Sequence, residues 1–363
     1  MLKETTKENK TFEIGLVMAG AVSAGAYTAG VIDFLIQALD EWQKAKEDGR
    51  TDCPQHDVKI KVISGASAGG MIGAIMTALL NDTFSPITTL PENEPDESVM
   101  SKNKLYDSWV EKIDITKLLT SQDLEKKKTP VKSILDSTVL NEIANSAITF
   151  TPCGSKRKYI SENLHIFLTL TDLRGVPYDI DFKGGTGEGH GLSQHADYMH
   201  FILSEQETDD EGALWLNPKD AKHESWNILK QAALATGAFP VGLAPRQLFR
   251  NSEDYDKRKW LIPQEPRVID GKCRVVNMKV IKPQWPDEFI EKGRSFKYKY
   301  LCVDGGVINN EPFEYAHRVL MGDDSFNPRN PKDVCRTILM IDPFPGVDSM
   351  TEKEVRICKL RYY

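Results

Sequence analysis

The stretch VKIKVISGASAGG, residues 58–70, contains the local pattern from which the fold class of the chain can be predicted. Its first part, residues 58–63, is rich in β-branched side chains and predicts a strand. Residues 64–70 are all small, which predicts a sharp turn, and residues 71–80 (MIGAIMTALL) predict a helix of small and apolar residues. The stretch therefore predicts a strand, a tight turn and a helix in direct succession.

The same succession occurs earlier in the chain. Residues 12–18 (FEIGLVM) predict a strand, residues 19–25 are small, and residues 26–42 predict a helix with apolar side chains on one face. Further strands are predicted at residues 164–170, 300–303 and 336–341. Strands that alternate with helices indicate an α/β fold, a three-layer sandwich with a mainly parallel central sheet and inserted loops.

Composition and charge exclude several classes of protein. With 363 residues, 40% of them hydrophobic and 27% charged, the chain is typical of a globular protein. Its formal net charge of −7 argues against nucleic acid as a partner, because contacts to phosphates need clustered Lys and Arg. The six cysteines form no CxxC pair, which favours reduced thiols over a disulfide framework or a zinc site.

The same observations bear on location. Residues 1–10 are polar and lack the apolar core of a signal peptide. No apolar run approaches the ~20 residues that span a bilayer. We therefore expect a cytoplasmic protein without a transmembrane segment, and peripheral contact with a membrane remains compatible with the sequence.

The motif Gly65-Ala-Ser67-Ala-Gly69 carries the first chemical prediction. A G-x-S-x-G sequence between a strand and a helix has the context of a nucleophile elbow, which exposes the serine hydroxyl on a strained turn. Glycines two residues before and after the serine let the strand and the helix approach closely. The sequence therefore predicts Ser67 as a nucleophile, whereas the alternative is a small-residue turn without chemistry.

A serine hydroxyl needs a base to accept its proton. Most of the seven histidines fall in polar segments, and none follows a late strand in a glycine-rich turn. Asp304 follows the predicted strand at residues 300–303 and precedes Gly305 and Gly306, so its carboxylate is expected at the carboxyl edge of the sheet. The sequence favours Asp304 as the base; an aspartate that only caps a turn is the alternative.

The small-residue loop at residues 20–25 (GAVSAG) is the third element. It lacks the G-K-[ST] of a phosphate loop and the central glycine of a dinucleotide fingerprint. Backbone amides of Gly20, Ala21 and Val22, together with that of Ala68, are instead predicted to hold an oxyanion beside the serine.

In this order, the glycine loop, the G-x-S-x-G motif and the late D-G-G resemble the patatin-like phospholipase family. Residues 232–240 (AALATGAFP), 169–173 (TLTDL) and 304–312 (DGGVINNEP) add to the resemblance, which extends from about residue 12 to about residue 312. It implies a carboxylic ester hydrolase with a Ser67–Asp304 dyad, an acyl-serine intermediate and a lipid or acyl ester as substrate. It implies no cofactor, and the sequence contains no EF-hand or other metal motif.

The loop departs from the family pattern of Gly-Gly-Gly-x-Arg/Lys-Gly after an aspartate. Ala19 replaces the aspartate, Ala21 and Val22 replace two glycines, and Ala24 replaces the basic residue. A β-branched residue tolerates a positive φ poorly. We therefore expect the loop either to use ordinary dihedrals or to lose a donor.

The resemblance also predicts the domain organisation. One patatin-like hydrolase domain is expected at residues 12–345, with insertions at about 81–108, 183–225 and 250–299. Residues 1–11 are expected to be an N-terminal tail, and residues 346–363 a C-terminal segment that begins a further region.

Two other functions remain open. One is a catalytically inactive lipid- or acyl-binding module with the same fold, which the substitutions in the loop would produce. The other is a histidine-assisted serine hydrolase that uses, for example, His223 or His317, although it leaves the D-G-G segment unexplained.

Overall fold

A computed structural model describes most of the chain. The described residues are 11–82, 84–87, 102–125, 130–152, 157–180, 190–208, 210, 212–258, 260–263, 266–269, 272–275, 278–287, 296–322, 328 and 330–344. The predicted C-terminal segment lies outside them, as does the predicted N-terminal tail except for Thr11.

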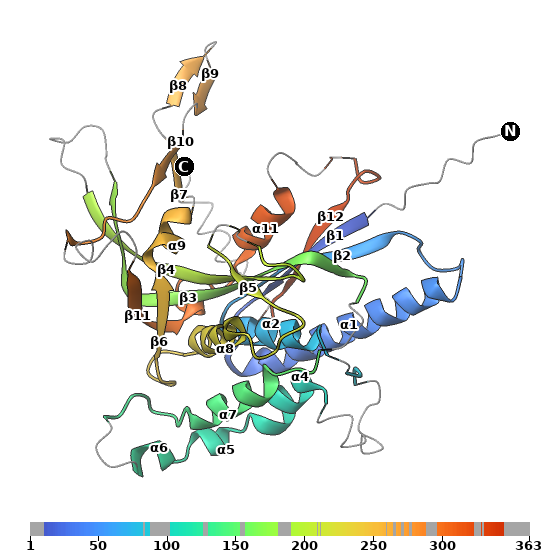
Figure 1. Cartoon of the computed structure of the whole chain (residues 1–363), viewed down its shortest axis with the longest axis horizontal. Helices are drawn as coiled ribbons and strands as arrows, with labels where there is room; N and C mark the ends of the chain where they lie inside the picture. Colours follow the sequence, from blue (N-terminus) through green and yellow to red (C-terminus); the bar gives the residue numbers. More distant parts are fainter. Residues whose placement is uncertain are drawn as a thin grey trace, which may run out of the picture.

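The parallel part of the central sheet is built from the predicted apolar strands. β12 (Arg336–Ile341), β1 (Thr11–Met18), β2 (Asp57–Gly65) and the first half of β3 (Ile160–Ile180) lie side by side in that order, and all are parallel. The end of β1 is buried on both faces, with Leu16, Val17 and Met18 all at 0% exposure. Continuous burial is typical of parallel strands that are covered on both sides. The predicted α/β sandwich with a mainly parallel sheet is confirmed (Figure 1).

Strand β3 pairs along one of its edges with two strands that run toward each other. β2 is parallel to β3 and ends with Gly65 opposite Leu168. β11 (Lys297–Asp304) is antiparallel to β3 and ends with Asp304 opposite Leu170. The carboxyl ends of β2 and β11 therefore meet within two residues of β3. The sequence alone predicts Asp304 at the carboxyl edge of a parallel sheet, and this antiparallel, end-to-end meeting is a correction to that expectation.

The sheet continues on the far sides of β3 and β11. β6 (Arg246–Asn251) pairs antiparallel with β11, and β4 (His190–Leu203) pairs antiparallel along β3. β5 (Leu214–Leu216) adds to β4 in parallel and completes a sheet of eight described strands. β4 and β5 lie inside the range 183–225, which the sequence predicts to be an insertion. Its polar composition is misleading, because the first half of β4 is exposed or half-buried, whereas most of the second half is buried.

Helices cover the sheet on both faces. α1 (Gly25–Glu47), α2 (Ser67–Leu79) and α8 (Glu224–Thr236) pack on the main apolar core, which includes Leu16 and Met18 of β1. α11 (Phe313–Met321) covers the other face, where Tyr315 and Leu320 pack with Val17. The side chains of β1 thus alternate between two layers, as expected for a strand. Figure 1 shows α11 across the sheet from α1, α2 and α8.

The segment Val22–Glu47, which contains α1, is long and apolar enough to cross a membrane by length and composition. In the structure α1 lies against the sheet, with Ile32 and Ile36 fully buried in the core. Packing therefore explains the apolar residues of its inner face. Only 39% of the most apolar 18 residues of this segment are buried, so packing on the core does not account for the apolar residues of the outer face.

The smaller elements extend this core. Two antiparallel ribbons project from the main sheet within the predicted insertion 250–299 (Figure 1): β7 (Trp260–Pro263) with β10 (Met278–Ile281), and β8 (Pro266–Ile269) with β9 (Lys272–Val275). The remaining described elements have at most ten residues each: η1 (Val22–Ala24), α4 (Lys104–Tyr106), the π-helix η2 (Asp107–Lys112), α5 (Ile115–Leu118), α6 (Gln122–Glu125), α7 (Thr138–Ala147), α9 (Ser252–Lys257) and η3 (Gly305–Val307). The predicted insertion 81–108 is only partly within the described residues.

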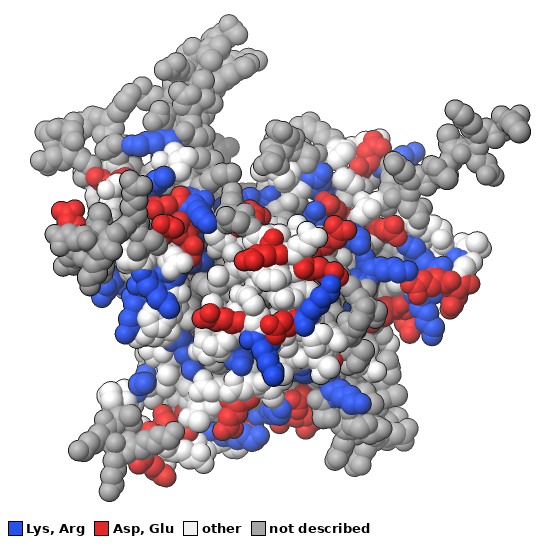
Figure 2. All heavy atoms as spheres, in the orientation of Figure 1, with Lys and Arg blue, Asp and Glu red and all other residues white. Residues whose placement is uncertain are grey.

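Charged side chains of both signs are interspersed on the face that Figure 2 shows. Several form ion pairs, such as Lys219 with Glu205 at 2.9 Å. Exposed pairs of this kind contribute about 0–1 kcal/mol each, so packing rather than surface charge holds the fold.

Candidate active site

Ser67 lies on the tight turn between β2 and α2, where the sequence predicts it. Its φ is +50°, a conformation that is rare for a residue with a side chain. The turn leaves no room for side chains beside it: a Cβ on Gly65 would lie 2.6 Å from the Gly69 carbonyl oxygen, and one on Gly69 would lie 2.3 Å from the Met18 carbonyl oxygen. Both glycines are required because strand and helix are in direct backbone contact.

The structure brings Ser67 and Asp304 together. The Ser67 Oγ donates a hydrogen bond to Asp304 Oδ2 at 2.6 Å, although the two residues are 237 positions apart. The side chains are largely buried, with residue exposures of 7% and 4%. The meeting of β2 and β11 end to end along β3 accounts for this contact.

The Asp304 carboxylate is held from its other side as well. Its Oδ1 accepts a hydrogen bond from the Gly306 amide at 2.7 Å, and its backbone N–H donates to the Ala238 carbonyl at 2.9 Å. The Thr171 hydroxyl donates to the Asp304 carbonyl at 2.8 Å. Gly305 packs on β3 so closely that a Cβ there would lie 2.2 Å from the Thr169 carbonyl oxygen. Both glycines of the D-G-G segment therefore have a structural role at the carboxylate.

Burial raises the pKa of the Asp304 carboxyl above its usual range. The hydrogen bonds from the Ser67 hydroxyl and the Gly306 amide act in the opposite direction, because they stabilise the ionised form. The net direction is upward. A carboxylate with a raised pKa accepts a proton more readily than an exposed one, which is the property that a general base needs.

The first loop approaches the serine directly. A Cβ on Gly20 would lie 2.9 Å from the Ser67 Cβ and 2.3 Å from Asn310 Oδ1, so only glycine fits. The Gly20 amide, however, donates to the Asn310 carbonyl at 3.1 Å. Contrary to the expectation that its amide holds an oxyanion, Gly20 is already engaged in a backbone hydrogen bond.

Val22 also departs from expectation. Its φ is +43°, so the loop does use the left-handed region at a β-branched residue, at a cost on the order of 1–2 kcal/mol. The Val22 side chain is 64% exposed, whereas Ala21 is buried. Across the site, the Ala68 amide belongs to the first turn of α2, where N–H groups have no acceptor within the helix. Unlike Gly20, the amides of Ala21, Val22 and Ala68 donate to no backbone carbonyl among the described residues, and their role at an oxyanion stays a prediction.

The sequence did not single out Thr236, which contacts the backbone of the serine. Thr236 is fully buried at the end of α8, and its Oγ1 accepts a hydrogen bond from the Ser67 N–H at 2.9 Å. This hydrogen bond holds Ser67 in its unfavourable φ and occupies the N–H of the serine itself. In the sequence, this role is indicated only by the position of Thr236 in the segment 232–240, where it is the one hydroxyl residue in an Ala-rich stretch.

The two histidines considered as bases make other contacts. His223 immediately precedes α8 and lies edge-on to the Trp215 ring at 5.2 Å. His317 stacks on Phe313 within α11, with ring centroids 5.9 Å apart. In the described part of the chain, no cluster of three or more His, Cys, Asp or Glu side chains is arranged to hold a metal ion.

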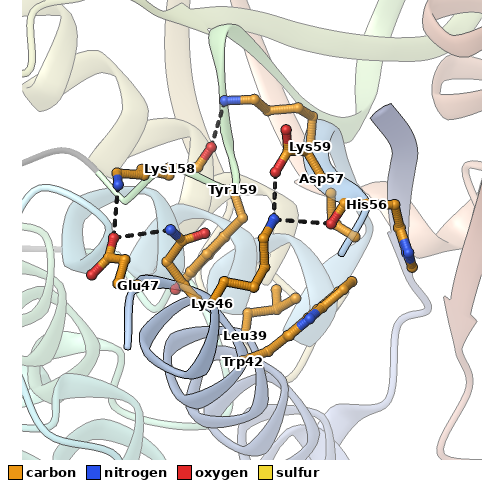
Figure 3. Close-up of a pocket in the computed structure, with 11 residues that line it drawn as sticks. Leu39, Trp42, Lys46, Glu47, His56, Asp57, Lys59, Lys158 and Tyr159 are labelled. Carbon is orange, nitrogen blue, oxygen red and sulfur yellow. Dashed lines mark hydrogen bonds and ion pairs between the residues drawn. The ribbon is translucent and has the colours of Figure 1, made fainter. Parts of the chain in front are cut away.

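A cavity of about 420 Å³ lies at the other end of β2, away from Ser67. Figure 3 shows its cations in contact with acceptors: Lys46 bonds Asp57 at 2.5 Å and the His56 carbonyl at 3.0 Å. Lys158 pairs with Glu47 at 2.8 Å. These contacts tie the end of α1 to the start of β2 and to the segment before β3, which is a structural role.

Comparisons with known proteins agree with this architecture. The sequence pattern of the patatin-like phospholipase family matches residues 16–317, a range that includes Ser67 and Asp304. The chain is also 36% identical over 368 aligned positions to the uncharacterized protein y4iI of Sinorhizobium fredii (strain NBRC 101917 / NGR234). The alignment covers 94% of this chain but 50% of that relative, so the chain spans about half of its length. Because the family pattern covers well over half of the chain, this protein belongs to the patatin-like phospholipase family of lipid acyl hydrolases.

Proposed function

We propose that the protein is a serine acyl hydrolase that cleaves carboxylic esters of lipids with a Ser67–Asp304 dyad. The observation that carries the proposal is the 2.6 Å hydrogen bond from the serine hydroxyl to a buried carboxylate. It is supported by the positive φ of Ser67, which is the backbone conformation of a nucleophile elbow. Membership of a lipid acyl hydrolase family supports the class of substrate.

In the first half of the proposed reaction, Ser67 Oγ attacks the ester carbonyl carbon while its proton passes to Asp304 Oδ2. The oxygen that becomes negative is stabilised by the Ala68 amide and by the amides of Ala21 and Val22. The positive end of the α2 dipole adds to this stabilisation. The tetrahedral intermediate collapses, the alcohol leaves with the proton from Asp304, and an acyl-Ser67 ester remains.

In the second half, water attacks the acyl-Ser67 carbonyl and gives its proton to Asp304. The intermediate collapses again, Ser67 recovers its proton and the fatty acid is released. The Gly306 amide keeps the Asp304 carboxylate oriented through both halves, because it binds the oxygen that does not contact Ser67. Thr236 keeps the serine backbone in place through its hydrogen bond with the Ser67 amide.

The inactive lipid-binding module remains the second candidate, because the loop departs from the family pattern. The engaged amide of Gly20 is the observation that favours it. Loss of one oxyanion donor lowers a rate by about 10²–10³. In the proposed hydrolase, the amides of Ala21, Val22 and Ala68 are the remaining oxyanion donors.

A fluorophosphonate probe separates these functions, because it labels a serine only when a base activates it. We expect labelling of the wild type that Ser67→Ala abolishes and Asp304→Asn reduces strongly, together with the loss of p-nitrophenyl butyrate hydrolysis in both variants. Circular dichroism serves as the control for folding. An unlabelled, well-folded wild type would favour the binding module, and undiminished hydrolysis by Asp304→Asn would contradict the dyad.

A further inference from the structure

The outer face of α1 has an unusual composition close to the proposed site. Three of its exposed positions follow one another four residues apart: Ala26, Gly30 and Phe34. Residues four apart are neighbours on a helix surface, so they form a continuous line of uncharged positions. Phe34 is 69% exposed and Val22 is 64% exposed, although both are apolar. The line begins at Ala26, directly after the loop at residues 20–25 that contacts Ser67 and contains Val22, and it runs along α1.

A cavity of about 300 Å³ lies along this line. Ala29 and Leu105 form buried parts of its lining, while Phe34 and Val110 are exposed parts. Trp109 brings η2 against the start of α1, since a Cβ on Gly25 would lie 2.3 Å from its ring. The cavity is therefore a groove between α1 and the segment from α4 to η2, two elements that are in contact with α1.

The one charged side chain among the lining residues, Asp33, has both carboxylate oxygens engaged in hydrogen bonds. Asp33 Oδ1 accepts from the Asn103 side-chain amide at 2.7 Å, and Oδ2 accepts from the Ile87 backbone at 2.8 Å. Asp33 is itself buried. The groove thus offers mainly apolar contacts to an occupant, and its acidic group is committed to the protein.

Gly30 provides the space at the middle of the groove. Among the described residues, nothing lies within 4 Å of the position that a Cβ on Gly30 would occupy. Glycine in the interior of a helix costs about 0.5–1 kcal/mol relative to alanine, and neither a close backbone approach nor a positive φ requires it here. A function in keeping this stretch of helix surface open explains the residue.

We propose that this groove binds the acyl chain of the substrate, so that the line from Ala26 to Phe34 selects medium or long acyl chains. The proposal rests on the proposed function for the ester chemistry at Ser67. Its occupant is an alkyl chain because the groove starts at Ala26, directly after the loop whose Gly20 lies against Ser67, and because its described lining is mainly apolar. The carbonyl lies at Ser67, and the chain passes Val22 and lies over Ala26 and Gly30.

The test fills the groove with the variant Gly30→Phe and compares kcat/KM for p-nitrophenyl decanoate and p-nitrophenyl butyrate below micelle-forming concentrations. We expect the decanoate-to-butyrate ratio to fall by about tenfold or more, since each methylene kept out of an apolar site lowers affinity by about fourfold. Ala38→Phe is the matched control. It adds the same ring on the same exposed face of α1, beyond the residues that line the groove, and is expected to leave the ratio unchanged.

A binding measurement keeps the test independent of turnover. In a Ser67→Ala background, the fluorescent long-chain acid cis-parinarate is expected to bind, and Gly30→Phe is expected to weaken it by about tenfold. Unchanged binding and an unchanged ester ratio in Gly30→Phe would overturn the groove. Two outcomes would overturn the acyl-chain groove in favour of a surface that docks on membranes. One is an equal loss of the ester ratio and of cis-parinarate binding in Ala38→Phe, and the other is a loss of activity in Gly30→Phe that is seen only with vesicle substrates.

The two proposals fail in different ways. If the wild type hydrolyses neither ester but cis-parinarate binding depends on Gly30, the groove stands and the proposed hydrolase falls. If both esters are hydrolysed and Gly30→Phe changes neither the ratio nor the binding, the hydrolase stands and the groove falls.

Discussion

Replacing Thr236 by valine tests whether the hydrogen bond to the Ser67 amide positions the nucleophile. Valine has nearly the same shape as threonine, so the contact of Thr236 with Gly70 is preserved while the acceptor is lost. Thr236 is at 0% exposure and Ser67 is at 7%, so water has little access to replace the acceptor. The perturbation therefore leaves one buried N–H without a partner.

The magnitude follows from two contributions. An unsatisfied buried backbone donor costs about 1–3 kcal/mol, so we expect the free energy of unfolding in urea to fall by about that amount. The serine also loses the contact that fixes its φ of +50°, and its Oγ then samples positions away from Asp304. Because this misplaces the nucleophile and not the substrate, kcat is expected to fall at least tenfold with a smaller change in KM.

The assay is steady-state hydrolysis of p-nitrophenyl butyrate together with the rate of fluorophosphonate labelling. Thr236→Ser is the matched control, because it keeps the hydroxyl and is expected to recover most of kcat. The reasoning would be refuted if Thr236→Val lost less than ~0.5 kcal/mol of stability and kept kcat within twofold of the wild type. A loss of stability with unchanged kcat would make Thr236 structural only.

Three further predictions concern the carboxylate and the turn. The pH profile of kcat/KM should fall on the acid side as Asp304 takes up a proton, with a midpoint above that of an ordinary aspartate because burial raises its pKa; a midpoint at or below the ordinary value would contradict this. Since the folded pKa is raised, the contribution of Asp304 to stability is greatest at low pH and decreases as pH rises through that pKa. Asp304→Asn should therefore gain stability relative to the wild type between acid and neutral pH in urea titrations, and a relative loss would show that the carboxylate is not penalised by burial. Gly69→Ala should destabilise the protein by about 1–3 kcal/mol or more, because its Cβ would lie 2.3 Å from the Met18 carbonyl oxygen. Gly30→Ala, which meets open space, is the control for Gly69→Ala and should not destabilise; equal effects of the two would contradict the packing argument.

Local sequence patterns predicted the parallel part of the fold well. β12 has the predicted bounds, β2 exceeds its predicted range by no more than two residues at either end, and α2 begins four residues before its predicted start, inside the predicted turn. β2 is rich in β-branched residues and α2 in small ones, and both elements are largely buried, so their local pattern and their tertiary environment agree. β3 is longer than predicted because Gly175 and Pro177 suggest a break, whereas the strand continues beside β4 after an irregularity in register.

The features that the sequence could not predict depend on distant contacts. Nothing in residues 297–304 indicates that β11 runs antiparallel to β3, since the direction of a strand depends on its connections. The engaged amide of Gly20 depends on Asn310, and the role of Thr236 depends on the approach of α8 to α2. The proximity of Ser67 and Asp304 followed from their residue types and motifs, but the path of the chain that produces it did not.

Because β2 and β11 both end against β3, the pairing register on this one strand sets the distance between Ser67 and Asp304. A slip of one residue by either neighbour would move its end by about 3.3 Å and turn its side chains to the other face of the sheet. A sheet in which β2 or β11 is out of register therefore places Ser67 and Asp304 beyond hydrogen-bonding distance. Ester turnover would then report, during refolding from denaturant, the moment at which both neighbours have docked in correct alignment.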